Sequence, residues 1–204
     1  PLGEMTQLTL DLLCVWESSE VPGQRKKIDE PHRLDAEKLQ SAFEVGRIGS
    51  VLNCAGHAYP TSQWRELVSG IQDASMQAKG LPAIYGVDAI HGATFTSGAA
   101  LGPQQIALAA TWDTLLVRQM AEATAQEIDA CGIPWNFAPV LGVGRDPRWP
   151  RFWETFGEDV KLVGDMGVAM VRGFQDGPVT VAATLKHYLG YSSPWSGKDR
   201  TPAY

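Results

Sequence analysis

Apolar residues follow two patterns that alternate along the chain. Short runs of continuous apolar character stand at 48–52, 83–87, 135–140 and 179–185. Between these runs, apolar residues recur every three or four positions, as a helix with one buried face requires. Continuous apolar runs are typical of strands that are covered on both faces. The pattern therefore predicts strands that alternate with helices, as in parallel βαβ units.

Capping residues and apolar stripes place the helices between these strands. We expect Asp35 to cap a helix that buries Leu39 and Phe43 and ends at Gly46, and Thr61 or Ser62 to cap the next one, which ends at Gly80. Thr111 is expected to cap a long helix over 112–131. The stripe expected for the second helix is Trp64, Leu67, Val68, Ile71 and Ala78, and that for the last helix is Val160, Val163, Met166, Val171 and Phe174.

The N-terminal segment is predicted from its spacing alone. Met5, Leu8 and Leu12 lie at helical intervals, so residues 2–15 are expected to form a short amphipathic helix. The polar segment at 16–33 contains Pro and Gly and is expected to be a loop.

Two segments that contain glycine can be compared with the phosphate-binding loops of nucleotide-binding folds. Gly142 to Gly144 is followed by Arg-Asp-Pro rather than by a third glycine, and Gly197-Lys198 is followed by Asp199 rather than by Ser or Thr. Neither segment has the pattern of a phosphate-binding loop. The fold class favoured is α/β, a (β/α)8 TIM-type barrel, and about four predicted strands make this roughly its first half.

The composition and the net charge of the chain exclude some classes of binding partner. With 204 residues, 44% hydrophobic and 20% charged, the chain can bury a substantial core. A net charge of −6 makes nucleic acid or an anionic membrane surface an unsuitable partner and favours a neutral ligand. No apolar run approaches the roughly 20 residues that cross a bilayer. We therefore expect neither a nucleic-acid partner nor a membrane partner.

Cysteine and histidine spacing bears on metals and disulfides. The chain has three cysteines, Cys14, Cys54 and Cys131, and no two of them form a Cys-x-x-Cys pair. The four histidines are not spaced as metal ligands usually are. Buried free thiols, no metal and no cofactor are therefore expected.

Charged residues follow three of the predicted strands directly or after a short spacer. Asp88 follows 83–87, Lys186 and His187 follow 179–185, and the loop 145–151 follows 135–140 after a short spacer. In (β/α)8 enzymes the carboxyl ends of the strands carry the active site, so these groups should share one rim. Carboxylate, Arg, Lys and His groups are suited to holding adjacent sugar hydroxyls. Alternatively, Asp88 caps a turn, His187 is a core residue, and Arg151 only pairs with Glu154 or Asp159.

Four motifs occur in series: GVDAIHG (86–92), RDPRWPRFWETFGED (145–159), LKHYLG (185–190) and SGKDRTP (196–202). Together they resemble the N-terminal barrel domain of glycoside hydrolase family 3, the β-glucosidase-like enzymes, over residues 2–204. The resemblance implies part of a retaining, exo-acting β-glucosidase that hydrolyses terminal β-D-glucosyl residues, as in polysaccharide degradation. It implies substrate binding by Asp88, Arg151, Lys186 and His187. Pro150 stands where the family commonly has Gly.

The same resemblance implies groups that the chain does not contain. The family's Asp nucleophile belongs to a later barrel strand and its Glu acid/base to a following domain, and neither motif occurs here. We therefore expect no catalytic residue in this chain. Residues 1–204 are expected to form an incomplete N-terminal portion whose partners are the second half-barrel and a following domain. Secretion or a periplasmic location is implied, and a cytoplasmic one stays open.

Several alternatives remain open. A β-xylosidase would share this half of the site. An N-acetylhexosaminidase is disfavoured because its branch is expected to carry an Asp/His pair after the KH motif, and no second histidine follows His187. A catalytically inactive carbohydrate-binding or assembly protein is the alternative outside enzymes. Supporting roles are expected for His91, Arg145, Asp146 and Arg148, and the candidate stacking platforms are Trp135, Trp149, Trp153 and Trp195.

Overall fold

The computed structural model describes residues 2–15, 33–54 and 56–203. Its centre is a five-stranded parallel sheet in which the strand order follows the sequence: β1 (Gln7–Thr9), β2 (Ser50–Leu52), β3 (Ile84–Val87), β4 (Trp135–Asn136) and β5 (Ala182–Ala183). Sequential parallel strands with intervening helices are the arrangement of part of a (β/α)8 barrel. The predicted fold class is confirmed.

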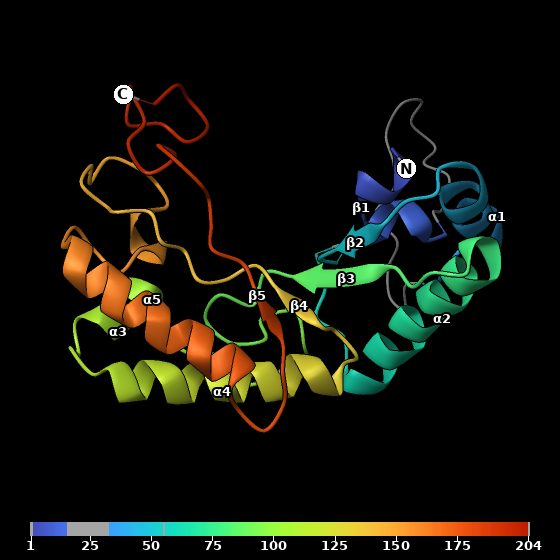
Figure 1. Cartoon of the computed structure of the whole chain (residues 1–204), viewed down its shortest axis with the longest axis horizontal. Coiled ribbons are helices and arrows are strands. Elements are labelled where there is room, and N and C mark those ends of the chain that lie inside the picture. The colour runs from blue at the N-terminus through green and yellow to red at the C-terminus, as the bar shows by residue number, and fades with distance from the viewer. Residues whose placement is uncertain (1, 16–32, 55, 204) are drawn as a thin grey trace.

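The helices connect successive strands. They are α1 (Ala36–Gln40), which continues as the π-helical turn η3 (Ser41–Val45), α2 (Thr61–Lys79), α3 (Gln105–Ala109), α4 (Thr114–Ala130) and α5 (Val160–Gln175); 3-10 turns are η1 (Gly3–Met5), η2 (Leu10–Leu13) and η4 (Phe152–Glu154). In Figure 1, α4 and α5 lie along one side of the sheet, while the loops after β4 and β5 extend together away from α4.

The helix expected at residues 2–15 is wrong. The segment instead forms η1, β1 and η2, and Leu8 of β1 pairs in parallel with Val51 of β2. Leu10 and Leu13 are buried, whereas Met5, which should have faced inward, is 76% exposed. Pairing with the edge of β2 therefore outweighs the local helical spacing and adds a strand to the four predicted. Apart from Arg33, the predicted loop at 16–33 lies outside the described residues.

The predicted helix caps are partly confirmed. The Asp35 carboxylate accepts hydrogen bonds from the backbone N–H groups of Glu37 and Lys38, and Gly80 ends α2 at φ 69°. The other two caps are wrong. Pro60 precedes α2 without any side-chain cap, because the helix begins at Thr61, and Asp113 rather than Thr111 caps α4 by accepting from Leu115 and Leu116.

The apolar stripes mostly reach the core. Trp64, Leu67, Val68 and Ile71 of α2 are buried, as are Val163, Met166 and Phe174 of α5. Val160 is 61% exposed because it is the first residue of α5, where the helix has not yet reached the packed face. The short helix α3 was not predicted.

Helices α4 and α5 approach each other closely at Gly173. A Cβ atom there would lie 2.4 Å from the carbonyl oxygen of Arg118 and 2.5 Å from the Ala121 Cβ. Gly164 of the same helix has no atom within 4 Å of its Cβ position. The two glycines therefore serve different purposes: one permits helix contact and the other faces open space.

We expect Gly173→Ala to lower the free energy of unfolding by about 1–3 kcal/mol, because backbone must move to admit the methyl group. Gly164→Ala is the matched control and should raise it by roughly 0.5–1 kcal/mol, because alanine loses less backbone entropy in a helix. Denaturant unfolding of the protein that carries this chain measures both. Equal effects of the two substitutions would contradict the close contact.

The three cysteines are free, with Cys14 and Cys131 buried and Cys54 half-buried. Burial raises the pKa of all three thiols, that of Cys14 to about 11, so they stay protonated near neutral pH. Within the described ranges, no group of three or more His, Cys, Asp and Glu side chains could hold a metal ion. None of the helices described there is long and apolar enough to cross a membrane.

Candidate functional site

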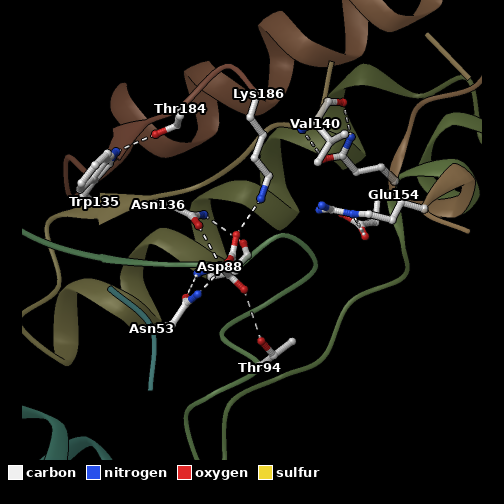
Figure 2. A network of polar contacts seen from close by, with 12 residues as sticks. Asn53, Asp88, Thr94, Trp135, Asn136, Val140, Glu154, Thr184 and Lys186 are labelled. Carbon is white, nitrogen blue, oxygen red and sulfur yellow. Dashed lines mark hydrogen bonds and ion pairs between the residues drawn. The ribbon is translucent and has the colours of Figure 1, made fainter. Parts of the chain in front are cut away.

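Side chains from three strand ends meet at the carboxyl rim of the sheet. Asp88 directly follows β3, Asn53 directly follows β2, and Lys186 lies three residues beyond β5. The Lys186 ammonium donates to Asp88 Oδ1 at 2.6 Å, and Asn53 Nδ2 donates to Asp88 Oδ2 at 2.8 Å. Figure 2 shows Lys186 and Asn53 approaching Asp88 from opposite sides. The Asp88 side chain does not cap a turn; it pairs with Lys186, which lies 98 positions away in the sequence.

Buried amide side chains hold the backbone of this rim. Asn136, at the end of β4, donates to the carbonyl of Ala89 and accepts from its N–H, each at 3.0 Å. Gln105 makes the same pair of bonds with Val140, at 2.9 and 3.0 Å. Both amides are fully buried. The two amides form hydrogen bonds with backbone N–H and C=O groups that lie beyond the ends of the short strands. These bonds fix the segment that carries Asp88 and the loop after β4.

Arg151 belongs to the loop between β4 and α5. Its Nε and Nη2 donate to the two carboxylate oxygens of Glu154 at 2.8 and 2.6 Å, a bidentate pair that raises the pKa of Arg151 and keeps it charged. The side chains of Arg151 and Glu154 are 22% and 14% exposed. The pairing with Glu154 that we considered as an alternative is present, whereas Asp159 instead caps α5.

The C-terminal motif at 196–202 supports the Arg151 loop. Asp199 Oδ1 accepts from the Tyr191 hydroxyl at 2.6 Å and from Trp149 Nε1 at 3.2 Å, and the Tyr191 hydroxyl accepts from Arg151 Nη1 at 3.2 Å. The bonds from Tyr191 and Trp149 lower the pKa of Asp199, so it stays ionised. The loops after β4 and β5 are thereby joined.

His187 completes the cluster of predicted residues. Its ring packs edge-on against Tyr191, with 4.7 Å between the centroids, and Arg151 lies over the Tyr191 ring at 5.5 Å. Burial lowers the pKa of His187 to about 4, assisted by the positive charges of Arg151 and Lys186 and opposed by Glu154 and Asp88. The structure therefore brings Asp88, Arg151, Lys186 and His187 together and holds the imidazole neutral at pH 7.

The pKa of His187 has a consequence for stability. Between about pH 4 and the ordinary histidine value of 6.5, the unfolded chain binds a proton that the folded chain excludes, so stability falls as pH decreases through this range. We expect His187→Gln to lose less thermal stability than the parent between pH 7 and pH 5. Unfolding midpoints of the protein that carries this chain at both pH values test this. An equal decrease in both proteins would contradict it.

The charged groups retain hydrogen-bonding capacity. A carboxylate has about four acceptor positions, of which Asp88 uses two for Asn53 and Lys186. Lys186 has three N–H groups and Arg151 five, and the bonds to described residues use one and three of them. Asp88 is 34% exposed, so solutes can reach it. The cluster thus has acceptor and donor positions that its bonds to described residues leave unused.

The remaining predicted residues have mixed outcomes. His91 Nδ1 lies 3.1 Å from the carbonyl oxygen of Gly102, so His91 is hydrogen-bonded to the backbone as expected, and Arg148 forms a bidentate pair with Asp146. Trp149 is only 1% exposed and is core rather than a stacking platform. Trp153 and Trp195 are 49% and 65% exposed, and Trp135 bonds to Thr184.

The sequence interpretation missed Asn53, Asn136 and Tyr191. Asn53 follows the apolar run 48–52 just as Asp88 follows 83–87, so the rule that located Asp88 would also have located Asn53. Asn136 lies inside an apolar run and has no comparable signal.

Comparison with known proteins identifies relatives of the whole chain. The model of the glycosyl hydrolase family 3 N terminal domain matches residues 11–203. A lysosomal beta glucosidase from Dictyostelium discoideum is 43% identical over 224 aligned positions, which cover 100% of this chain and 26% of the relative. A periplasmic beta-glucosidase from Salmonella typhimurium is 29% identical over 195 positions, covering 93% of this chain and 24% of the relative.

Solved structures share the fold. The crystal structure of a mutant exo-1,3/1,4-beta-glucanase from a Pseudoalteromonas species matches with a TM-score of 0.78 and 28% sequence identity, over 98% of this chain and 31% of that one. The chain thus spans about a quarter of the length of these curated relatives.

Proposed function

Because this chain belongs to glycosyl hydrolase family 3, we propose that it forms the sugar-binding part of a β-glucosidase that removes terminal β-D-glucosyl residues. The observation that carries the proposal is the Asp88–Lys186 ion pair at the strand-end rim, with Arg151 and His187 beside it. These four side chains present acceptors, donors and a neutral imidazole to one small volume. A glucose ring offers adjacent hydroxyls that each donate and accept, which matches this set.

We propose that each residue binds the sugar whose bond is cut. Asp88 accepts from two neighbouring hydroxyls, while Lys186 and Arg151 donate to oxygen atoms of the ring substituents through their remaining N–H groups. Neutral His187 both donates and accepts. Fixing the ring in this way orients its anomeric carbon and lowers the entropic part of the barrier.

The bond-making groups are proposed to lie elsewhere in the protein. A retaining glycosidase needs a carboxylate nucleophile and an acid/base group about 5–5.5 Å apart. The proposal assigns these to the remaining half of the barrel and to a following domain, with which this chain would complete the active site. The reaction is then a double displacement through a covalent glycosyl-enzyme, and it retains the anomeric configuration.

The alternatives differ in the sugar or in catalysis. A β-xylosidase of the same family would use the same rim, and an N-acetylhexosaminidase would require an acetamido pocket. An inactive carbohydrate-binding protein would keep the rim without turnover. We favour the β-glucosidase, and we propose secretion or a periplasmic location because one relative is named periplasmic.

Hydrolysis by the protein that carries this chain tests the proposal. We expect turnover of an aryl β-D-glucoside, with the β-anomer of glucose appearing first in proton NMR spectra. Preferred turnover of the xyloside or the N-acetylglucosaminide would favour those alternatives, and sugar binding without turnover of any of the three would favour the inactive protein.

A further inference from the structure

Asn53 is held at the rim through both its side chain and its backbone. Its Nδ2 donates to Asp88 Oδ2 at 2.8 Å, and its Oδ1 accepts from the backbone N–H of Asp88 at 2.8 Å. Its own N–H donates to the Gly86 carbonyl at 2.9 Å, and its carbonyl accepts from the Tyr85 hydroxyl at 2.5 Å. Tyr85 is fully buried, so Asn53 is anchored in the core at one end and holds Asp88 at the other.

The backbone of Asn53 restricts which residue can stand there. Its φ of 52° lies in the left-handed region, which asparagine and aspartate adopt more readily than other residues with a side chain. The bond to Asp88 Oδ2 requires a donor, and the bond from the Asp88 N–H requires an acceptor. Asparagine meets all three conditions, whereas aspartate meets only two of them near neutral pH.

We propose that Asn53 is a positioning residue that orients the Asp88 carboxylate toward the sugar, an inference that rests on the proposed function. Lys186 alone fixes one carboxylate oxygen and leaves rotation about the Cβ–Cγ bond of Asp88. The Asn53 amide fixes the second oxygen, so the plane of the carboxylate is defined (Figure 2). The remaining acceptor positions then face the open side of the rim in one orientation.

The variant Asn53→Asp distinguishes the orienting of the Asp88 carboxylate from a role of Asn53 in the loop conformation alone. The variant keeps the size, the left-handed conformation and the acceptor for the Asp88 N–H, but it replaces the donor by a second carboxylate. Lys186 pairs with Asp88, and the other charged or titratable groups of the cluster are Arg151, Glu154 and His187; the variant leaves all of them in place. Two adjacent carboxylates resist full ionisation and share a proton as pH falls. Because Lys186 pairs with Asp88, that proton resides on the new Asp and restores a donor.

The expected result is a pH-dependent loss of kcat/KM with an aryl β-D-glucoside, measured on the protein that carries this chain. Asn53→Asp should lose about 100-fold relative to the parent at pH 7.5 and only about tenfold at pH 5, since the donor returns on protonation. Asn53→Gly, which removes the donor without adding charge and adopts the left-handed conformation without strain, should lose about tenfold at both pH values.

The outcomes distinguish the alternatives. The positioning role would be overturned if either variant kept the kcat/KM of the parent. It would also be overturned if the loss in Asn53→Asp did not change with pH. Asn53 would then be a residue that only shapes the loop. If Asn53→Asp fails to fold, Asn53→Gly, which adopts the left-handed conformation without strain, decides by whether its kcat/KM falls. An active parent with unchanged variants refutes this inference alone, and a parent without turnover refutes it together with the proposed function.

Discussion

Asp88→Ala should reduce kcat/KM for an aryl β-D-glucoside by about 10²–10⁴-fold in the protein that carries this chain. The substitution removes two hydrogen bonds between a charged carboxylate and sugar hydroxyls, each contributing about 1.5–3 kcal/mol, and each 1.36 kcal/mol is a factor of ten in rate. It also leaves Lys186, whose side chain is 12% exposed, without its ion-pair partner. Steady-state kinetics with both proteins give the ratio.

The matched control for this substitution is Asp73→Ala. Asp73 is an exposed aspartate on α2, away from the strand-end rim, and kcat/KM should stay within about twofold of the parent because its surroundings are solvated. Equal turnover by Asp88→Ala and the parent would show that Asp88 does not bind the sugar.

Arg151→Lys should lower kcat/KM by about 10²–10³-fold, although it conserves the charge. Arg151 uses Nε and Nη2 for Glu154 and Nη1 for Tyr191, so its bonds to described residues leave two N–H groups, held in fixed directions. A lysine ammonium is a point donor on a flexible stem and cannot satisfy Glu154 bidentately while reaching Tyr191 and the ligand. The loss corresponds to roughly 3–4 kcal/mol of transition-state stabilisation.

Arg118→Lys provides the comparison for Arg151→Lys. Arg118 also pairs with a glutamate, Glu122, but its side chain is 40% exposed on α4. Exposed helix pairs contribute only a few tenths of a kcal/mol, so this variant should retain kcat/KM within about twofold. Similar kinetics for the two lysine variants would indicate that the fork of Arg151 is not needed for the reaction.

The position of the rim could be predicted because it depends on where strands end. Asp88 and Lys186 follow apolar runs, and parallel strands place their carboxyl ends at one edge. The extent of the strands could not be read in the same way. The run 179–185 forms only the two-residue strand β5, because its continuous ladder with β4 is limited to Trp135 and Asn136. Beyond this ladder the two segments stay paired only through separate backbone hydrogen bonds and the isolated bridge between Val140 and Lys186.

Other features depend on contacts that are remote in sequence. Residues 7–9 form a strand because β2 offers a free edge, and no local pattern of three residues can show that. The bond between Trp149 and Asp199 joins residues 50 positions apart, so the motif at 196–202 could be noticed but its support of the Arg151 loop could not be assigned. Asn53 could have been predicted from the sequence, since it stands at the end of an apolar run.

A crystal structure of the protein that carries this chain, with D-glucose bound, tests the central proposal most directly. We predict that both carboxylate oxygens of Asp88 accept from ring hydroxyls at about 2.5–3.0 Å, with Lys186, Arg151 and His187 within hydrogen-bonding distance of the same sugar. Glucose bound at another site, with the Asp88–Lys186 pair free of any sugar contact, would contradict the proposal.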